Sequence, residues 1–145
     1  MTSKWSGRSV DSLVGTFLQL GKSYPPIDGE GGVEAFDRHR NEMAAVAKAL
    51  KESGSEGEAA LLSLMDHELV PIRLTAAQAS LSFAKDRAID VLIDIIEARA
   101  AEFSMDAMFT LLFAGEYDMN AGPKRRPYKV PLDEQYPRLP SRPKK

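Results

Sequence analysis

The run of residues 66–97 constrains the fold more than any other stretch of this 145-residue chain. Pro71 lacks an N–H group, so it is favoured in the first turn of a helix, where the backbone donors are unpaired anyway. Small residues then recur, which lets a neighbouring helix approach closely. Apolar residues at helical spacing follow: Ala88, Val91, Leu92, Ile95 and Ile96. The run therefore predicts two consecutive helices, over residues 70–84 and 86–101, joined by a very short turn.

Four more helices are predicted from apolar residues that recur at helical spacing. Ser9 or Asp11 is expected to cap the first helix and Ser104 the last, and Gly21 is expected to end the first one. A loop rich in proline and glycine follows over residues 22–32. The other helices are expected over residues 33–53, 58–66 and 104–114. No alternating strand pattern occurs, so the sequence predicts an all-α protein of about six helices.

The first of the two central helices carries a recognisable pattern. Asp66, then Ile72-Arg73, Ala76-Ala77 and Leu81, resembles the second half of a HEAT repeat. Consecutive helix hairpins of similar length are also how stacked helical repeats are built. The resemblance implies that Asp66 and Arg73 tie neighbouring turns together and that the alanines allow close packing. We therefore expect a small HEAT-like stack of antiparallel helix hairpins.

A closer resemblance covers residues 13–117. The segments HRNEMAAVAKALKESG and ALLSLMDHELVPIRLTAAQASLSFAKDRAIDVL are similar to the small bacterial family of domains of unknown function numbered twenty-nineteen. The chain departs from that family pattern in the Pro/Gly loop, in EFSMDAMFTLL and in its basic C-terminal tail. The family implies little about activity, so function has to be inferred from the residues themselves.

The C-terminal part of the chain differs in composition from the rest. Six of the nine prolines fall after residue 120, and no apolar periodicity survives there. We therefore expect a flexible N-terminus over residues 1–8, a HEAT-like all-α domain over residues 9–119, and a basic Pro-rich tail over residues 120–145 that is extended or disordered.

The formal net charge of −2 hides an asymmetry between the two ends of the chain. Residues 121–145 carry eight basic and two acidic side chains, a charge of +6, which leaves −8 for residues 1–120. This uneven distribution of charge is informative about the partners of the protein and not about its fold. A mixture of basic and aromatic groups in the tail makes nucleic-acid phosphates a candidate partner for Lys124, Arg125, Arg126, Tyr128 and Lys129.

The second central helix carries four acids at helical spacing: Asp86, Asp90, Asp94 and Glu97. A solvated outer face tolerates like charges at a cost of a few tenths of a kcal/mol. Alternatively, the four acids bind a basic partner, as in an immunity protein or an adaptor, and speed the encounter. On the last helix, exposed apolar residues are expected to close the stack or to form a dimer: Met105, Met108 and Phe113.

No catalytic constellation accompanies these features. The chain has two histidines and no cysteine, and it lacks His-Glu-x-x-His spacing. His39 is expected at the surface, and the adjacent Asp66, His67 and Glu68 do not converge on one point, so capping is the better account of them. We therefore expect a non-enzymatic protein–protein interaction module without cofactor or metal. Nucleic-acid binding through the tail is the alternative.

The lengths of the apolar runs in the sequence predict where in the cell the protein is located. No stretch of roughly 18 apolar residues and no apolar run of signal-peptide length occurs in the chain. We therefore expect a cytoplasmic protein that does not associate with membranes. The sequence leaves the oligomeric state open.

Overall fold

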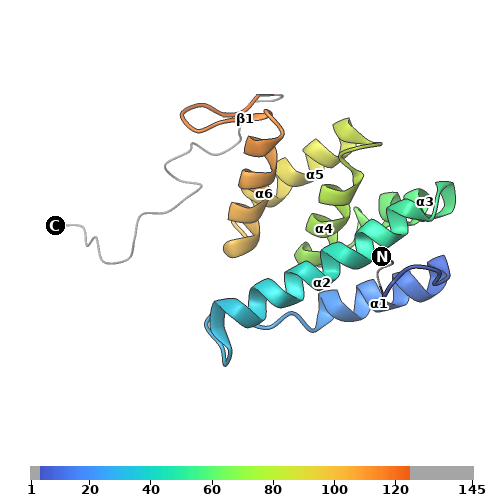
Figure 1. Cartoon of the computed structure of the whole chain (residues 1–145). Coiled ribbons are helices and arrows are strands. Elements are labelled where there is room, and N and C mark those ends of the chain that lie inside the picture. Colours follow the sequence, from blue (N-terminus) through green and yellow to red (C-terminus); the bar gives the residue numbers. More distant parts are fainter. Residues whose placement is uncertain (1–3, 125–145) are drawn as a thin grey trace. The chain divides into compact units, whose positions relative to one another are not determined.

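The computed structural model describes residues 4–124 of the chain. These residues form six helices and one short antiparallel hairpin (Figure 1): α1 (Val10–Lys22), α2 (Gly32–Glu52), α3 (Ser55–Leu64), α4 (Val70–Ser80), α5 (Lys85–Glu97), α6 (Glu102–Phe113), β1 (Tyr117–Asp118) and β2 (Gly122–Pro123). The prediction of an all-α protein with about six helices is confirmed. The predicted tail contacts Arg125, Arg126, Tyr128 and Lys129 lie outside the described residues.

The chain divides into two compact units, Met1–Val91 and Leu92–Lys145, with the boundary inside α5. In the first unit, α1 and α2 lie side by side and antiparallel, and α3 and α4 follow as a second pair (Figure 1). Fully buried apolar side chains fill this unit: Leu13, Phe17, Met43, Leu50, Leu61, Met65 and Ile72. Ser9 caps α1, as predicted, because its Oγ accepts a hydrogen bond of 3.1 Å from the amide of Ser12.

Gly21 does not end α1, which continues to Lys22. This glycine is buried against α4, where an added Cβ would overlap the side chain of Ile72 and lie 2.8 Å from its Cδ1. The prediction that Gly21 terminates the helix was therefore wrong. The residue is needed for a close approach between two helices rather than for a turn.

The connection between α4 and α5 is longer than predicted. Helix α4 ends at Ser80 rather than at residue 84. The Ser80 carbonyl accepts hydrogen bonds from the amides of Phe83 and Ala84 at 3.2 and 2.7 Å, within the turn that follows. The turn occupies residues 81–84, and α5 begins one residue earlier than predicted. Helix α5 is also buried over a wider arc than its predicted face, because Ile89 and Ile93 are fully buried with Ala88, Leu92, Ile95 and Ile96.

Ser104 occupies the first turn of α6 rather than its cap position, which belongs to Ala101. Ser104 is 3% exposed, and its hydroxyl makes two hydrogen bonds. Ser104 Oγ accepts from the Ala100 amide at 2.5 Å and donates to the Ile95 carbonyl at 2.8 Å. The side chain thus holds the end of α5 to the start of α6. The prediction of a Ser104 cap was wrong in position, although the residue does satisfy a backbone amide near the helix start.

Replacing Ser104 with alanine is expected to destabilise the protein by about 1–3 kcal/mol, because the Ala100 amide loses its partner in a part-buried position. Urea unfolding followed by circular dichroism measures this change. Ser23→Ala is the matched control, since the Ser23 hydroxyl is exposed and donates to Gln19 at the end of α1. Equal losses in the two variants would contradict a special role for Ser104.

The hairpin after α6 was not expected from the sequence. Tyr117 is 4% exposed and pairs with Pro123, and Asp118 pairs with Gly122. The Lys124 amide donates to the Glu116 carbonyl at 3.1 Å, which closes the hairpin. Strands of two residues are too short to produce a visible alternation of polar and apolar side chains, so the pattern could not reveal them.

Candidate functional site

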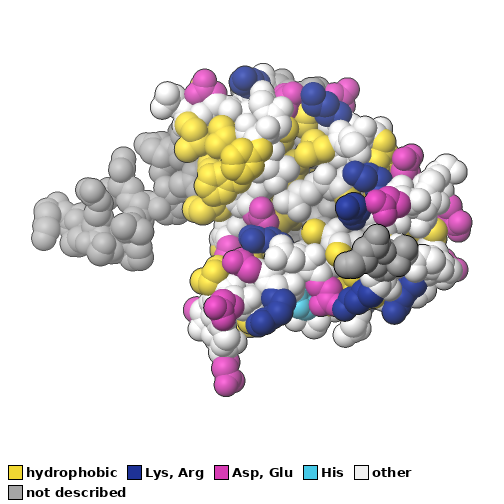
Figure 2. Space-filling model, viewed as in Figure 1, with side chains coloured by type: hydrophobic (Ala, Val, Ile, Leu, Met, Phe, Trp, Pro, Cys, Tyr) yellow, Lys and Arg dark blue, Asp and Glu magenta, His cyan; other side chains and the backbone are white. Residues whose placement is uncertain are grey.

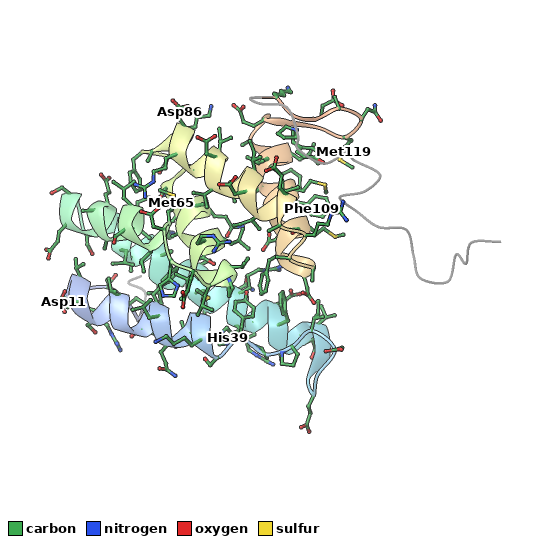
Figure 3. All side chains as sticks on the ribbon, turned by 180° about the vertical axis from the view of Figure 1, so that it is seen from behind. Asp11, His39, Met65, Asp86, Phe109 and Met119 are labelled. Carbon is green, nitrogen blue, oxygen red and sulfur yellow. The ribbon has the colours of Figure 1, made fainter. Side chains whose placement is uncertain are left out.

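The four acids of α5 lie on one stripe of the helix, as predicted. Asp86, Asp90 and Asp94 are exposed and Glu97 is half-buried. Figure 3 shows Asp86 at the start of the helix. The apolar residues of α5 are fully buried over most of the circumference, so the acids occupy the part that remains open to solvent. Their position follows from burial of the other faces, and it fits both a solvated face and a basic partner.

A second surface is apolar and lies on α6. Met105, Phe109 and Phe113 are 49%, 41% and 82% exposed, and their four-residue spacing places them on one face of the helix. The rings of Phe109 and Phe113 stack with centroids 6.2 Å apart and planes 19° from parallel. Figure 2 shows hydrophobic side chains gathered in this region. We call Met105, Phe109 and Phe113 the α6 face.

The α6 face differs in one member from the predicted set. Met105 and Phe113 are exposed as expected, but Met108 is only 7% exposed and belongs to the buried side with Ala107 and Leu111. Including Met108 was wrong, and Phe109 was missed. The signal that identifies Phe109 is the four-residue spacing from Met105 to Phe113. Met119 in the hairpin turn adds another exposed apolar side chain to this unit, at 58%.

Acidic groups accompany the α6 face. Glu102 and Asp106 lie on the same helix, three residues before Met105 and Phe109 respectively, and both are half-buried. Residues 92–124 contain six acids and two basic side chains, a net charge of −4. Basic groups on a partner would therefore be attracted to the acids of residues 92–124, while apolar groups would contact the α6 face.

The cluster at the end of α3 is structural. Asp66 Oδ2 pairs with Arg87 Nη2 at 2.6 Å, and the Leu69 amide donates to His67 Nδ1 at 3.0 Å. Arg73 Nη1 donates to the carbonyls of His67 and Glu68 at 3.1 and 2.9 Å. Arg73 thus fixes the turn before α4. Asp66 makes its ion pair with α5 instead of with Arg73.

His39 also serves the packing of helices. Its Nε2 lies 2.5 Å from the Leu20 carbonyl, which assigns the proton to Nε2 in this contact. The imidazole ring packs against Tyr24, with centroids 4.7 Å apart. Figure 3 shows the side chain between α1 and α2. His39 therefore joins the end of α1 to α2.

Residues 4–124 contain neither a candidate metal site nor a candidate membrane-spanning helix. No three His, Asp or Glu side chains of this range are grouped so that they could hold a metal ion. No helix of the same range has the length and apolar content needed to cross a membrane.

The fold and these surfaces define a small helical protein with an exposed apolar helix face. Among family models, the one described as Domain of unknown function (DUF2019) matches residues 11–113. The match spans more than half of the chain, so the protein belongs to this family, as the resemblance of residues 13–117 predicted. Comparison with curated proteins gave no match, and comparison with solved structures gave none either.

Proposed function

We propose that the protein is a non-enzymatic interaction module that binds another protein through the α6 face. The observation that carries this proposal is the exposure of two stacked phenylalanine rings, Phe109 and Phe113, beside Met105. Contiguous exposed apolar side chains on a small protein mark an interaction site far more often than single ones do. Aromatic side chains, phenylalanine among them, are also enriched at protein–protein interfaces relative to the rest of the surface.

The partner that fits has an apolar surface bordered by lysine and arginine. Glu102 and Asp106 flank the α6 face, and residues 92–124, which contain it, carry a net charge of −4. The stripe of acids on α5 adds negative charge that attracts a basic partner during encounter. An adaptor or an immunity protein against a basic toxin is the class of function that this combination favours.

Two further parts of the proposal concern fold type and location. The consecutive packing of α1 through α4, with Arg73 holding the turn before α4, supports a HEAT-like stack of hairpins. The lack of cysteine in the sequence supports a cytoplasmic location. Both histidines contact backbone atoms, which supports a structural rather than a catalytic use of them.

Affinity capture from the native host tests the proposal. The baits are the wild-type chain, the double variant Phe109→Ser/Phe113→Ser, and Val33→Ser as a control. Val33 is 57% exposed but lies on α2 in the other unit. We expect one partner that the wild type and Val33→Ser retain and the double variant loses. With the purified partner, calorimetry should show the double variant to bind at least about thirtyfold more weakly.

Two results would overturn the proposal. One is capture of the same proteins by all three baits. The other is a dimer of the chain itself in light scattering that the double variant abolishes, because the α6 face would then join two copies of this protein. Raising the salt concentration separates the contributions of charge and apolar contact, since only the former is screened.

A further inference from the structure

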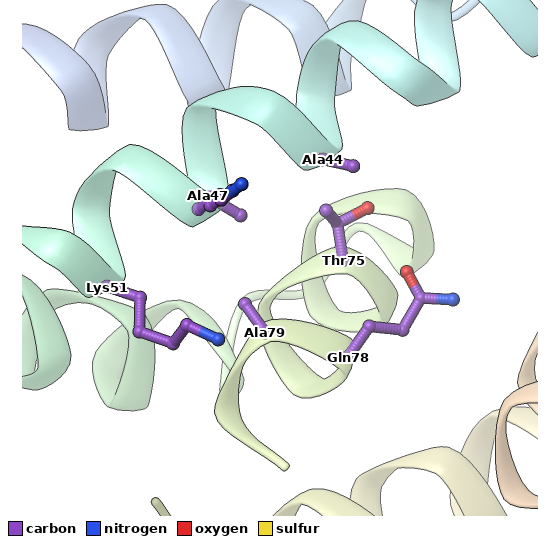
Figure 4. A pocket seen from close by; sticks show the side chains of 7 residues that line it. Ala44, Ala47, Lys51, Thr75, Gln78 and Ala79 are labelled. Atoms are coloured by element: carbon purple, nitrogen blue, oxygen red, sulfur yellow. The ribbon is translucent and has the colours of Figure 1, made fainter. Parts of the chain in front are cut away.

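A pocket of about 250 Å³ lies between α2 and α4, wholly within the unit Met1–Val91. Figure 4 shows its α2 side with Ala44, Ala47 and Lys51, and its α4 side with Thr75, Gln78 and Ala79. The alanines form apolar walls. A dry apolar cavity of about 150 Å³ holds a benzene molecule, so this pocket has room for a small organic ligand.

The Thr75 hydroxyl is the most informative group in the pocket. Thr75 is 4% exposed, and its Oγ1 makes no hydrogen bond with any residue in the range 4–124. The hydroxyls of Ser80 and Thr110 instead donate to the carbonyl four residues earlier, at 2.7 and 2.8 Å. A buried hydroxyl without a partner is unfavourable, so a molecule that bonds to Thr75 in the pocket would be stabilised.

Positive charge borders the same pocket. Lys48 and Lys51 both line it, and neither makes an ion pair with a residue in the described part of the chain. In Figure 4, Lys51 extends from α2 toward Ala79. Two ammonium groups near a buried hydroxyl attract an anion and form strong charge-assisted hydrogen bonds with it.

The chemistry of the lining selects the type of anion. The residues that line the pocket come from the middle and end of α2 and of α4, and none of them lies in the first turn of its helix, where free backbone amides could bind a phosphate. A carboxylate needs fewer donors than a phosphate. The alanine walls suit a short apolar body attached to it.

We infer that this pocket binds a small carboxylic acid with a short aliphatic or aromatic body. Its carboxylate accepts a hydrogen bond from the Thr75 hydroxyl and pairs with Lys48 and Lys51, while its body contacts Ala44, Ala47 and Ala79. The site goes beyond the proposed protein partner and lies in the unit that does not contain the α6 face. The two proposals therefore stand or fall separately.

Titration of the full chain with benzoate, followed by amide NMR shifts, tests the inference. We expect saturable shifts at millimolar benzoate that are confined to residues 44–51 and 75–79. Benzamide, which has the same shape without the charge, should bind much more weakly. Thr75→Val should weaken benzoate binding about tenfold or more, because a hydrogen bond to a charged group is lost. Lys51→Gln should weaken binding too, and Lys22→Gln on α1 should not.

A stability measurement provides the second readout. Thr75→Val keeps the shape of the side chain and removes a buried hydroxyl without a partner, so it should raise the melting temperature of the free protein while lowering benzoate affinity. Thr110→Val is the control, since it removes a bonded hydroxyl and should leave benzoate binding unchanged. The inference is overturned by the absence of localised shifts, which would leave water as the only occupant. Equal binding of benzamide, or a lower melting temperature for Thr75→Val, would overturn it as well.

Discussion

Replacing Gly57 with alanine is expected to destabilise the protein by about 3 kcal/mol or more. Gly57 is buried in α3, and an added Cβ would overlap the Leu50 carbonyl oxygen and lie 2.7 Å from its carbonyl carbon. The obstacle is the backbone of α2, so no side-chain rotation relieves it. Either α3 shifts away from the end of α2 or the packing between them is lost.

The matched control for Gly57 is Gly15→Ala. Gly15 lies inside α1 and is exposed, and a Cβ there would meet nothing within 4 Å. Alanine is the better helix former, so this change is expected to stabilise the protein by about 0.5–1 kcal/mol. Urea unfolding of both variants should thus give shifts of opposite sign. If Gly57→Ala also stabilised the protein, α3 would not approach α2 as closely as we describe.

Gly57 also shows why boundaries were harder to predict than helices. The segment ESGSEGE reads as a turn because glycine favours turns, yet α3 begins at Ser55 and includes Gly57. A glycine can be required either because the backbone adopts a positive φ or because another helix comes very close to it. The sequence alone does not show which of these two reasons applies at a given position. Gly54 has φ +82° and precedes the helix, whereas Gly57 and Gly21 are helical and allow contact with another helix. Those contacts are long-range, so local pattern could not reveal them.

The candidate surfaces were predictable to different degrees. The acids of α5 repeat at helical spacing against a strongly apolar background, so the sequence placed them on one stripe. Helix α6 is apolar nearly all round, and such a helix is usually covered on all sides. Which of its faces stays exposed depends on the packing of its neighbours. The pocket beside Thr75 is lined by residues from two helices. The spacing of residues within either helix therefore could not predict it.

Two substitutions in α6 are expected to have very different effects. Leu111 is fully buried, so Leu111→Ala should destabilise the protein by about 2–5 kcal/mol through lost burial and a cavity. Phe113 is 82% exposed and lies two residues later in the same helix. Phe113→Ala should therefore change the free energy of unfolding by no more than about 0.5 kcal/mol, although it removes the larger side chain. Urea unfolding of both variants measures the contrast.

The difference in stability between Leu111→Ala and Phe113→Ala tests whether the α6 face serves binding or folding. A phenylalanine that contributes nothing to the free energy of unfolding is retained for something other than folding, and exposed aromatic residues weaken solubility. If Phe113→Ala is as stable as the wild type and still loses the partner captured by the wild-type chain, the side chain acts in binding alone. A loss of stability equal to that of Leu111→Ala would instead mean that Phe113 is packed within the folded chain. The α6 face would then be part of the core and closed to a partner.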